Sequence, residues 1–195
     1  FEGTNIYAAE DMPDIDLLLL THDHYDHLDY STVCKLDRKV KRIVTSLGVG
    51  QHLEYWNINP LKITELNWWE ETIVTDQVKL TATPARHFSG RGTMRGKTLW
   101  SSFVLDVHGT RIFAGGDSGY DQSFRKIGEK FGPFELAILE NGQYNKNWPY
   151  IHMMPEETVQ ASADLRARVV LPVHWGKFTL SLHPWREPIE RALRQ

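Results

Sequence analysis

Cysteine, long apolar runs and blocks of basic residues are all scarce in this sequence. Its one cysteine among 195 residues, Cys34, excludes an intramolecular disulfide and fits a reducing compartment. The longest apolar run, residues 17–20 extended by Ile15, is far shorter than the roughly 18 residues that a membrane span needs. The 22 basic and 25 acidic residues give a net charge of −3 without a basic block, so we expect no nucleic-acid partner.

The composition is that of a globular protein. Hydrophobic residues make up 41% of the chain and charged residues 24%, and no repeat or linker divides it, so we expect one domain over residues 1–195. The cysteine content favours the cytoplasm. Because Phe1 is not an initiator residue, we expect a domain that is incomplete at its N-terminus. An upstream targeting segment or membrane association therefore stays open.

Strand and helix patterns alternate along the chain. The apolar run from Ile15 to Thr21 predicts a strand buried on both faces, and residues 101–107 and 111–114 flank His108-Gly109-Thr110 as a β-hairpin. This alternation is typical of a layered α/β fold. Further strands are expected over residues 42–46, 63–66, 77–83, 136–140 and 169–173, and helices over residues 50–56, 122–130 and 155–165.

The densest group of metal-ligand side chains follows the first strand, in Thr21-His22-Asp23-His24-Tyr25-Asp26-His27. An extended backbone points His22 and His24 to the same side, whereas Asp26 and His27 need a turn to point elsewhere. Four such side chains within six residues can serve two adjacent metals, and imidazole with carboxylate suits Zn²⁺. A surface loop that happens to be histidine-rich is the alternative, and the buried strand before it disfavours that interpretation.

Three further candidate ligands share one position, just beyond a predicted strand. His87, Asp117 and His174 each follow such a strand, and sites in α/β sheets gather at the carboxyl ends of strands. Glycines at positions 115, 116 and 119 flank Asp117 and allow close backbone approach. Each residue alone would more often be an ordinary loop residue. Their shared position favours one common site.

These motifs resemble those of the metallo-β-lactamase superfamily, whose signature is His-x-His-x-Asp-His. Within it the sequence is most similar to the N-acyl-phosphatidylethanolamine-hydrolysing phospholipase D group and its bacterial relatives. The likeness spans roughly residues 15–180. The group's motifs recur as His-Asp-His-Tyr-Asp-His-Leu-Asp (22–29), Gly-Asp-Ser-Gly-Tyr (116–120), His-Met-Met-Pro-Glu-Glu (152–157) and His-Trp-Gly-Lys-Phe (174–178).

The resemblance implies a four-layered αββα sandwich that holds two zinc ions. Asp117 would bridge the ions, and His152 would contact a substrate phosphate unless it only caps the helix that follows. The family's domain has strands before its metal motif, so part of the first sheet is expected to lie outside this chain. The other implied ligands are His22, His24 and His87 on one ion, and Asp26, His27 and His174 on the other.

The expected function is that of a zinc-dependent hydrolase that uses a metal-bridging hydroxide, with Asp117 and His152 in catalytic roles; iron or manganese could replace zinc. Two Zn²⁺ ions against Asp26, Asp117 and a hydroxide leave about one positive charge, which favours an anionic substrate. We therefore expect a phosphodiesterase of the N-acyl-phosphatidylethanolamine phospholipase D type, acting on a small-molecule or lipid phosphodiester with peripheral membrane contact.

Two other functions stay open. One is a lactonase or other carboxylic-ester hydrolase on the same dinuclear site, and the other is a metal-binding protein without turnover. β-Lactamase activity is disfavoured because the common zinc β-lactamases carry cysteine where this chain has Asp117. The sequence carries no signal for an oligomeric state.

Some residues near the motifs have two interpretations. Asp29 could orient a metal-bound histidine or cap a helix. His52, His108 and His183 are expected not to be ligands, and Cys34 has no expected role. Six apolar residues could form core or line a groove for an acyl chain, with core favoured: Trp148, Tyr150, Met153, Met154, Trp175 and Phe178.

Overall fold

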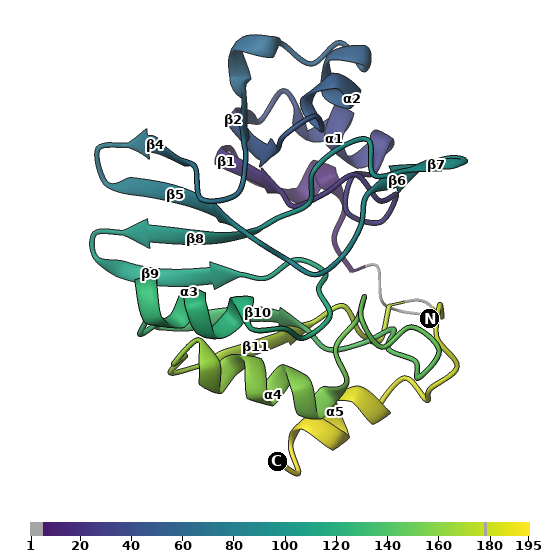
Figure 1. The fold of residues 1–195 in the computed structure, drawn as a ribbon. Helices are drawn as coiled ribbons and strands as arrows, with labels where there is room; N and C mark the ends of the chain where they lie inside the picture. Colours follow the sequence, from purple (N-terminus) through teal and green to yellow (C-terminus); the bar gives the residue numbers. More distant parts are fainter. Residues whose placement is uncertain (1–5, 178) are drawn as a thin grey trace.

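The computed structural model describes residues 6–177 and 179–195. Two β-sheets stack between two layers of helices (Figure 1). The first sheet is parallel, in the order β1 (Ile15–Leu20), β2 (Val40–Ser46) and β3 (Ile63–Leu66). Helices α1 (Tyr30–Leu36) and α2 (Gly50–Tyr55) and two short 3₁₀ turns (Ala9–Asp11 and Pro60–Lys62) accompany it.

The second sheet has six strands in the order β11-β10-β9-β8-β5-β4. In the series β4, β5, β8 and β9 each strand runs antiparallel to the next, and β9, β10 and β11 run parallel. Helices α3 (Ser123–Phe131), α4 (Pro155–Asp164) and α5 (Glu187–Ala192) belong to this half, and β6 (Gly90–Arg91) pairs with β7 (Met94–Arg95) as a separate ribbon. The strands are β4 (Glu71–Thr75), β5 (Val78–Thr83), β8 (Ser102–Val107), β9 (Thr110–Ala114), β10 (Leu136–Glu140) and β11 (Val170–Val173).

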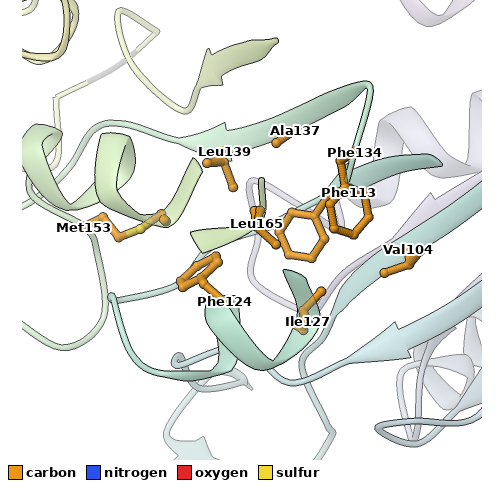
Figure 2. Packing of buried hydrophobic residues seen from close by; sticks show 10 residues of the cluster. Val104, Phe113, Phe124, Ile127, Phe134, Ala137, Leu139, Met153 and Leu165 are labelled. Carbon is orange, nitrogen blue, oxygen red and sulfur yellow. The ribbon is translucent and has the colours of Figure 1, made fainter. Parts of the chain in front are cut away.

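Three apolar clusters separate the layers. Leu28, Val33 and Leu53 join the first sheet to its helices, and Val44, Leu80 and Phe103 belong to the cluster between the sheets. A third cluster joins the second sheet to α3 and α4, and Figure 2 shows its aromatic rings around Leu165. The order of layers is therefore helix, sheet, sheet, helix, which confirms the predicted layered α/β fold. The cluster in Figure 2 contains Val104, Phe113, Phe124, Ile127, Phe134, Ala137, Leu139, Met153, Ala161 and Leu165.

The β8–β9 hairpin forms as its turn residues predict. His108 and Gly109 have φ angles of 52° and 82°, and two consecutive left-handed residues are what a tight hairpin turn of the favoured twist requires. The sequence patterns did not predict some other elements. Strand β4 is an edge strand with a largely exposed pattern, and α1 is a short helix that contains β-branched residues.

Strand β1 is less buried than its apolar sequence predicts. Residues 17–19 are half-buried, and β1 is at the end of its sheet, paired only with β2 among the described residues. Its outer edge and part of its inner face therefore lack cover from the described chain. None of the helices within the described ranges has the length and apolarity to cross a bilayer.

Strand directions bring the candidate site together. Strands β5, β9, β10 and β11 point the same way, because β8 is antiparallel to both β5 and β9, and β9 to β11 are parallel. Their carboxyl ends therefore meet at one edge of the second sheet. The loop after β1 reaches the same edge, where the backbone N–H of Ser101 donates to the carbonyl of Thr21.

Candidate metal centre

The loop after β1 makes the turn that its sequence requires. The backbone N–H groups of His27 and Leu28 both donate to the carbonyl of His24, at 3.1 and 2.8 Å. Leu28 is fully buried in the first helical cluster and so anchors this turn. The turn directs Asp26 and His27 away from the first pair of histidines.

Three histidines converge on one point. Nδ1 of His24 lies 3.0 Å from Nε2 of His22 and 3.2 Å from Nε2 of His87. Oδ2 of Asp117 lies 3.9 Å from Nε2 of His22 and 3.7 Å from Nε2 of His87. These four side chains form the first metal-ligand group of the structure.

A second group shares the same carboxylate. Oδ2 of Asp26 lies 3.4 Å from Nε2 of His27 and 3.3 Å from Nε2 of His174. Oδ2 of Asp117 lies 3.1 Å from Nε2 of His27 and 3.5 Å from Nε2 of His174. One oxygen of Asp117 therefore faces histidines of both groups. All seven residues predicted as ligands lie at this one place.

The spacing of these atoms fits metal ions. Four ligand atoms at 2.0–2.1 Å from a tetrahedral zinc ion are about 3.3 Å apart, and the separations above run from 3.0 to 3.9 Å. The buried Oδ1 of Asp117 has no hydrogen-bond partner within the described part of the chain, and the buried Nε2 of His27 faces the carboxylates of Asp117 and Asp26 without hydrogen-bond geometry to either. Buried polar atoms without partners are costly unless something else binds them. The donor set of imidazole and carboxylate suits zinc, and also iron or manganese.

The histidines of the first group are in the charge state that metal ligands need. Burial lowers the pKa of His22, His24 and His87, that of His87 to about 3, despite the nearby carboxylate of Asp117. These rings are therefore neutral at pH 7 and carry free lone pairs, as metal ligands must.

In the second group the carboxylates determine the charge state of the histidines. Burial opposes charge on His27 and His174, but Asp117 and Asp26 outweigh it and raise the pKa of His27 to about 9 and that of His174 to about 11. The same contacts hold the pKa of both carboxyls well below the usual range, although burial acts the other way. In the absence of metal, the positive charges of these two protonated imidazoles balance the negative charges of the two carboxylates.

Backbone geometry explains two of the glycines near the site. Gly116 has a φ of 61°, and a Cβ there would lie 3.0 Å from the side chain of Thr21. A Cβ on Gly142 would lie 2.3 Å from the carbonyl oxygen of His174, which itself has a φ of 64°. Both positions therefore need glycine to let the ligand loops approach. The left-handed conformation of His174 is uncommon outside glycine and is typical of functional sites.

His152 lies beside these two groups and, with Asp117, Glu140 and His174, belongs to a third set of side chains whose ligand atoms are close enough to hold an ion. It is 5% exposed, and its ring centroid is 5.2 Å from that of His87 and 5.4 Å from that of His174. The N-cap of α4 is Met154, so the alternative interpretation of His152 as a helix cap is wrong.

One residue of the site was not predicted from the sequence. Glu140 ends β10, is 1% exposed, and its Oε2 lies 3.1 Å from Nδ1 of His152. An acid that ends an otherwise apolar strand was the available signal, but nothing in the local pattern shows what it contacts.

The hypothesis that Asp29 orients a metal ligand is wrong. Its Oδ1 accepts a hydrogen bond from the backbone N–H of Thr32 at 2.7 Å, which makes it the N-cap of α1. The histidines expected not to be ligands, His52, His108 and His183, belong to neither group.

A cavity of about 230 Å³ opens beside both groups. Phe88, Trp148, Ile151 and Leu180 form its apolar wall, and His152 lies among its lining residues. Of the six apolar residues with two interpretations, Trp148 therefore lines the cavity. Met153 is core, Met154 caps α4, Tyr150 is exposed, Trp175 stacks on Trp185, and Phe178 lies outside the described residues.

An αββα sandwich with two His/Asp groups that share one carboxylate at its strand ends defines the metallo-β-lactamase class of folds. The chain matches the Beta-lactamase superfamily domain over residues 4–175 and belongs to this family. This confirms the resemblance seen in the motifs.

Relatives fall into the expected group. An uncharacterized protein of Mycobacterium tuberculosis is 44% identical over 186 residues, which are 93% of this chain and 50% of that protein. The mitochondrial N-acyl-phosphatidylethanolamine-hydrolyzing phospholipase D of Saccharomyces cerevisiae is 37% identical over 204 residues, 93% of this chain and 40% of that protein. The chain thus spans about half the length of the curated relatives it matches.

Solved structures agree on the fold. Igni18, a metallo hydrolase from the archaeon Ignicoccus hospitalis, superposes with a TM-score of 0.73 at 21% identity, over 93% of this chain and 72% of that one.

Proposed function

We propose that this chain carries the catalytic centre of a metal-dependent hydrolase that cleaves phosphodiesters of the N-acyl-phosphatidylethanolamine type. The observation that supports it most is the position of Oδ2 of Asp117, 3.1–3.9 Å from four histidine nitrogens that belong to two ligand groups. A closed structural zinc site has four ligands and no open position, whereas these groups adjoin a cavity.

The proposed ligand residues belong to two metal sites. His22, His24 and His87 would hold one ion and Asp26, His27 and His174 the other, and Asp117, whose Oδ2 faces histidines of both groups, would belong to both. Two such ions would supply an activated water and a clamp for the attacked and leaving oxygens.

His152 lines the cavity together with residues of both ligand groups. Its Nδ1 is taken up by Glu140, so Nε2 is the atom left for a substrate. We assign it contact with an oxygen of the attacked group and transfer of a proton to or from that oxygen.

The apolar wall of the cavity suits an apolar part of a substrate. Phe88, Trp148 and Leu180 would contact an acyl or other hydrocarbon group, which a lipid phosphodiester offers. The same wall supports a second candidate, a lactone or other carboxylic ester. Among the described residues neither lysine nor arginine lines this cavity, so a phosphate there would depend on the metals and His152 for its charge.

A substrate panel tests the proposal. The full chain, stripped of metal and reloaded with Zn²⁺, Fe²⁺ or Mn²⁺, is assayed on bis(p-nitrophenyl) phosphate, on N-acyl-phosphatidylethanolamine vesicles, on a homoserine lactone and on a β-lactam. We expect turnover of the phosphodiesters that disappears in the His22→Ala variant. Faster turnover of the lactone would favour the second candidate. Tight metal binding without any turnover would favour a non-catalytic protein and contradict the proposal.

We also propose that further strands of the longer protein cover the inner face of β10 and β11. Leu171 and Val173 are 49% and 36% exposed, while Val170, which precedes them in the strand, packs against the helical side, so the two point toward the other sheet. A cavity of about 340 Å³ lined by Leu19, Ile138 and Val173 lies between the sheets and reaches Asp117 and His174. Hydrogen exchange in β11 should slow when a longer protein, of the length of the relatives, replaces this chain. Equal exchange rates would contradict the proposal.

A further inference from the structure

We propose that Glu140 is a positioning residue that holds His152 and His174 together, each with its proton on Nδ1 and its Nε2 turned toward the reaction centre. The inference deepens the proposed function and rests on it in one respect, that the centre binds metal. Neither the sequence motifs nor the predicted ligand set includes Glu140.

Every polar atom of the Glu140 side chain has a defined contact. Oε1 accepts the backbone N–H of Met153 at 2.6 Å, and Oε2 faces Nδ1 of His152 at 3.1 Å and Nδ1 of His174 at 3.6 Å. The side chain of Thr158 donates to the carbonyl of Glu140 at 3.1 Å and fixes the end of the strand on α4. A carboxylate that is 1% exposed is thus tied to the turn and helix that follow His152.

The chemistry of a carboxylate decides which nitrogen of each ring carries the proton. An ionised carboxylate only accepts hydrogen bonds, so a ring nitrogen that faces it must donate. A neutral imidazole with its proton on Nδ1 has its lone pair on Nε2. Glu140 therefore selects this tautomer in His152 through a hydrogen bond and favours the same tautomer in His174, whose Nδ1 faces it at 3.6 Å.

For His174 this tautomer is the one that metal binding needs. Its Nε2 lies 3.3 Å from Asp26 and 3.5 Å from Asp117, on the side of the second ligand group. A carboxylate behind a metal-bound histidine fixes the ring's orientation and makes it a more basic ligand. At 3.6 Å, Glu140 is the carboxylate that Nδ1 of His174 faces but is not within hydrogen-bond distance, and this buried nitrogen has no other hydrogen-bond partner among the described residues.

For His152 the same carboxylate leaves Nε2 free for the substrate. Its ring is nearly parallel to that of His174, with an angle of 18° between the planes, and it lines the cavity beside the metal-ligand groups. One buried acid thus couples the orientation of a metal ligand to that of the substrate-contacting ring.

A Glu140→Gln variant separates positioning from support of the fold. Glutamine has the same shape, and its carbonyl oxygen can still accept the N–H of Met153. Its NH₂ group would then face Nδ1 of His152 as a donor, which forces the ring's proton to Nε2. The matched control is Glu65→Gln, because Glu65 also accepts a backbone N–H at 2.6 Å, from Gly50, and belongs to neither ligand group.

The readouts are the ¹⁵N NMR signals of the histidine rings and zinc affinity by chelator competition, both on the zinc-loaded full chain, together with kcat and KM. We expect Nδ1–H signals for His152 and His174 in the wild type and in Glu65→Gln. In Glu140→Gln we expect a shifted His152 tautomer, about 10- to 100-fold weaker binding of the second zinc ion, and a lower kcat with a nearly unchanged KM.

Unchanged ring tautomers and zinc affinity in Glu140→Gln would overturn the inference, even if the variant melts at a lower temperature. If Glu140→Gln does not fold, Glu140→Asp replaces it, since it keeps the charge and draws the carboxylate back by one methylene. The same changes, in smaller degree, are expected there, and wild-type values would overturn the inference. A wild type that hydrolyses nothing, but whose His152 tautomer and zinc affinity respond as described, would refute the proposed function and support the role of Glu140.

Discussion

The geometry of the two ligand groups depends on the position of a single atom. Oδ2 of Asp117 approaches nitrogens of four histidines, so this one oxygen holds the groups at a fixed separation. In the proposed centre the residues of the two groups would bind the ions, whereas His152 would act beside them. This difference makes the two kinds of residue separable by experiment.

Alanine variants of His22 and His152 should fail in different ways. His22→Ala removes an imidazole from the first group, so it should lose hydrolysis and metal content together. His152→Ala should lower kcat by about 100-fold and keep both metals, since the proposed function makes the ring a proton-transfer group rather than a ligand. Elemental analysis with kinetics checks this pair. Equal metal loss in the two variants would contradict the assigned roles.

Metal uptake should release protons from the second group. His27 and His174 have pKa values of about 9 and 11 in the absence of metal, so both are protonated at pH 7, and a metal ion must displace about two protons. The first group binds without proton release because its histidines are already neutral. Affinity for the second ion should therefore fall about 100-fold for each pH unit below 7.

Calorimetric titration in two buffers of different ionisation enthalpy counts the displaced protons. The His22→Ala variant, which keeps His27 and His174, is the control. Metal uptake at the second group without any proton release would show that the two imidazoles are neutral before the ion arrives.

At the scale of elements, α1 shows how a residue beside a metal motif can serve the fold instead. Asp29 caps the helix, and Val33 and Leu36 bury its inner side. The motif position suggested a role at the metal, but the N–H of Thr32 is much nearer in sequence and satisfies the carboxylate first.

Asp29→Ala should therefore lower stability and spare the metals. Loss of an N-cap costs about 1 kcal/mol, because the freed N–H of Thr32 loses its partner. Asp16→Ala is the control, since Asp16 makes an exposed ion pair with Lys41 and should contribute less. Urea unfolding measures the first effect and elemental analysis the second. Metal loss in Asp29→Ala would restore the idea that this residue orients a ligand.

Sequence patterns predicted the elements with strong periodicity and failed on those held by tertiary contacts. Strands β8 and β9 have alternating side chains and a left-handed turn, so local rules suffice. Strand β4 is an edge strand that exists because it pairs with β5, and its own residues carry a weak pattern. The same holds for the site. The candidate ligands could be predicted because each follows a strand, whereas Glu140 ends a strand and nothing in its neighbouring residues indicates what it contacts.

At the scale of the whole molecule, the centre joins the two sheets. The loop after β1 supplies ligands from the first sheet, and the second sheet supplies His87, Asp117 and His174. Metal binding should therefore stabilise the pairing of the two halves, which is a property of the fold rather than of any single loop.

Metal loading should raise the melting temperature, and a chelator should lower it. An ion present at 100 times its Kd adds about 2.7 kcal/mol, which corresponds to roughly 5–10 °C for a chain of this size. His152→Ala should show the same shift, and His22→Ala a smaller one. Differential scanning calorimetry measures it. A melting temperature that does not depend on metal would contradict a centre that links the sheets.

The sequence by itself determined the donor types, their order along the chain and their place at strand ends, because local periodicity specifies faces and ends. Only the tertiary structure decided which atoms meet. Nε2 of His174 and Oδ2 of Asp26 come within 3.3 Å across 148 positions of sequence, and Glu140 comes to lie behind two histidines. Such meetings depend on which strands become neighbours and how the sheets stack, and that depends on the packing of side chains far apart along the chain.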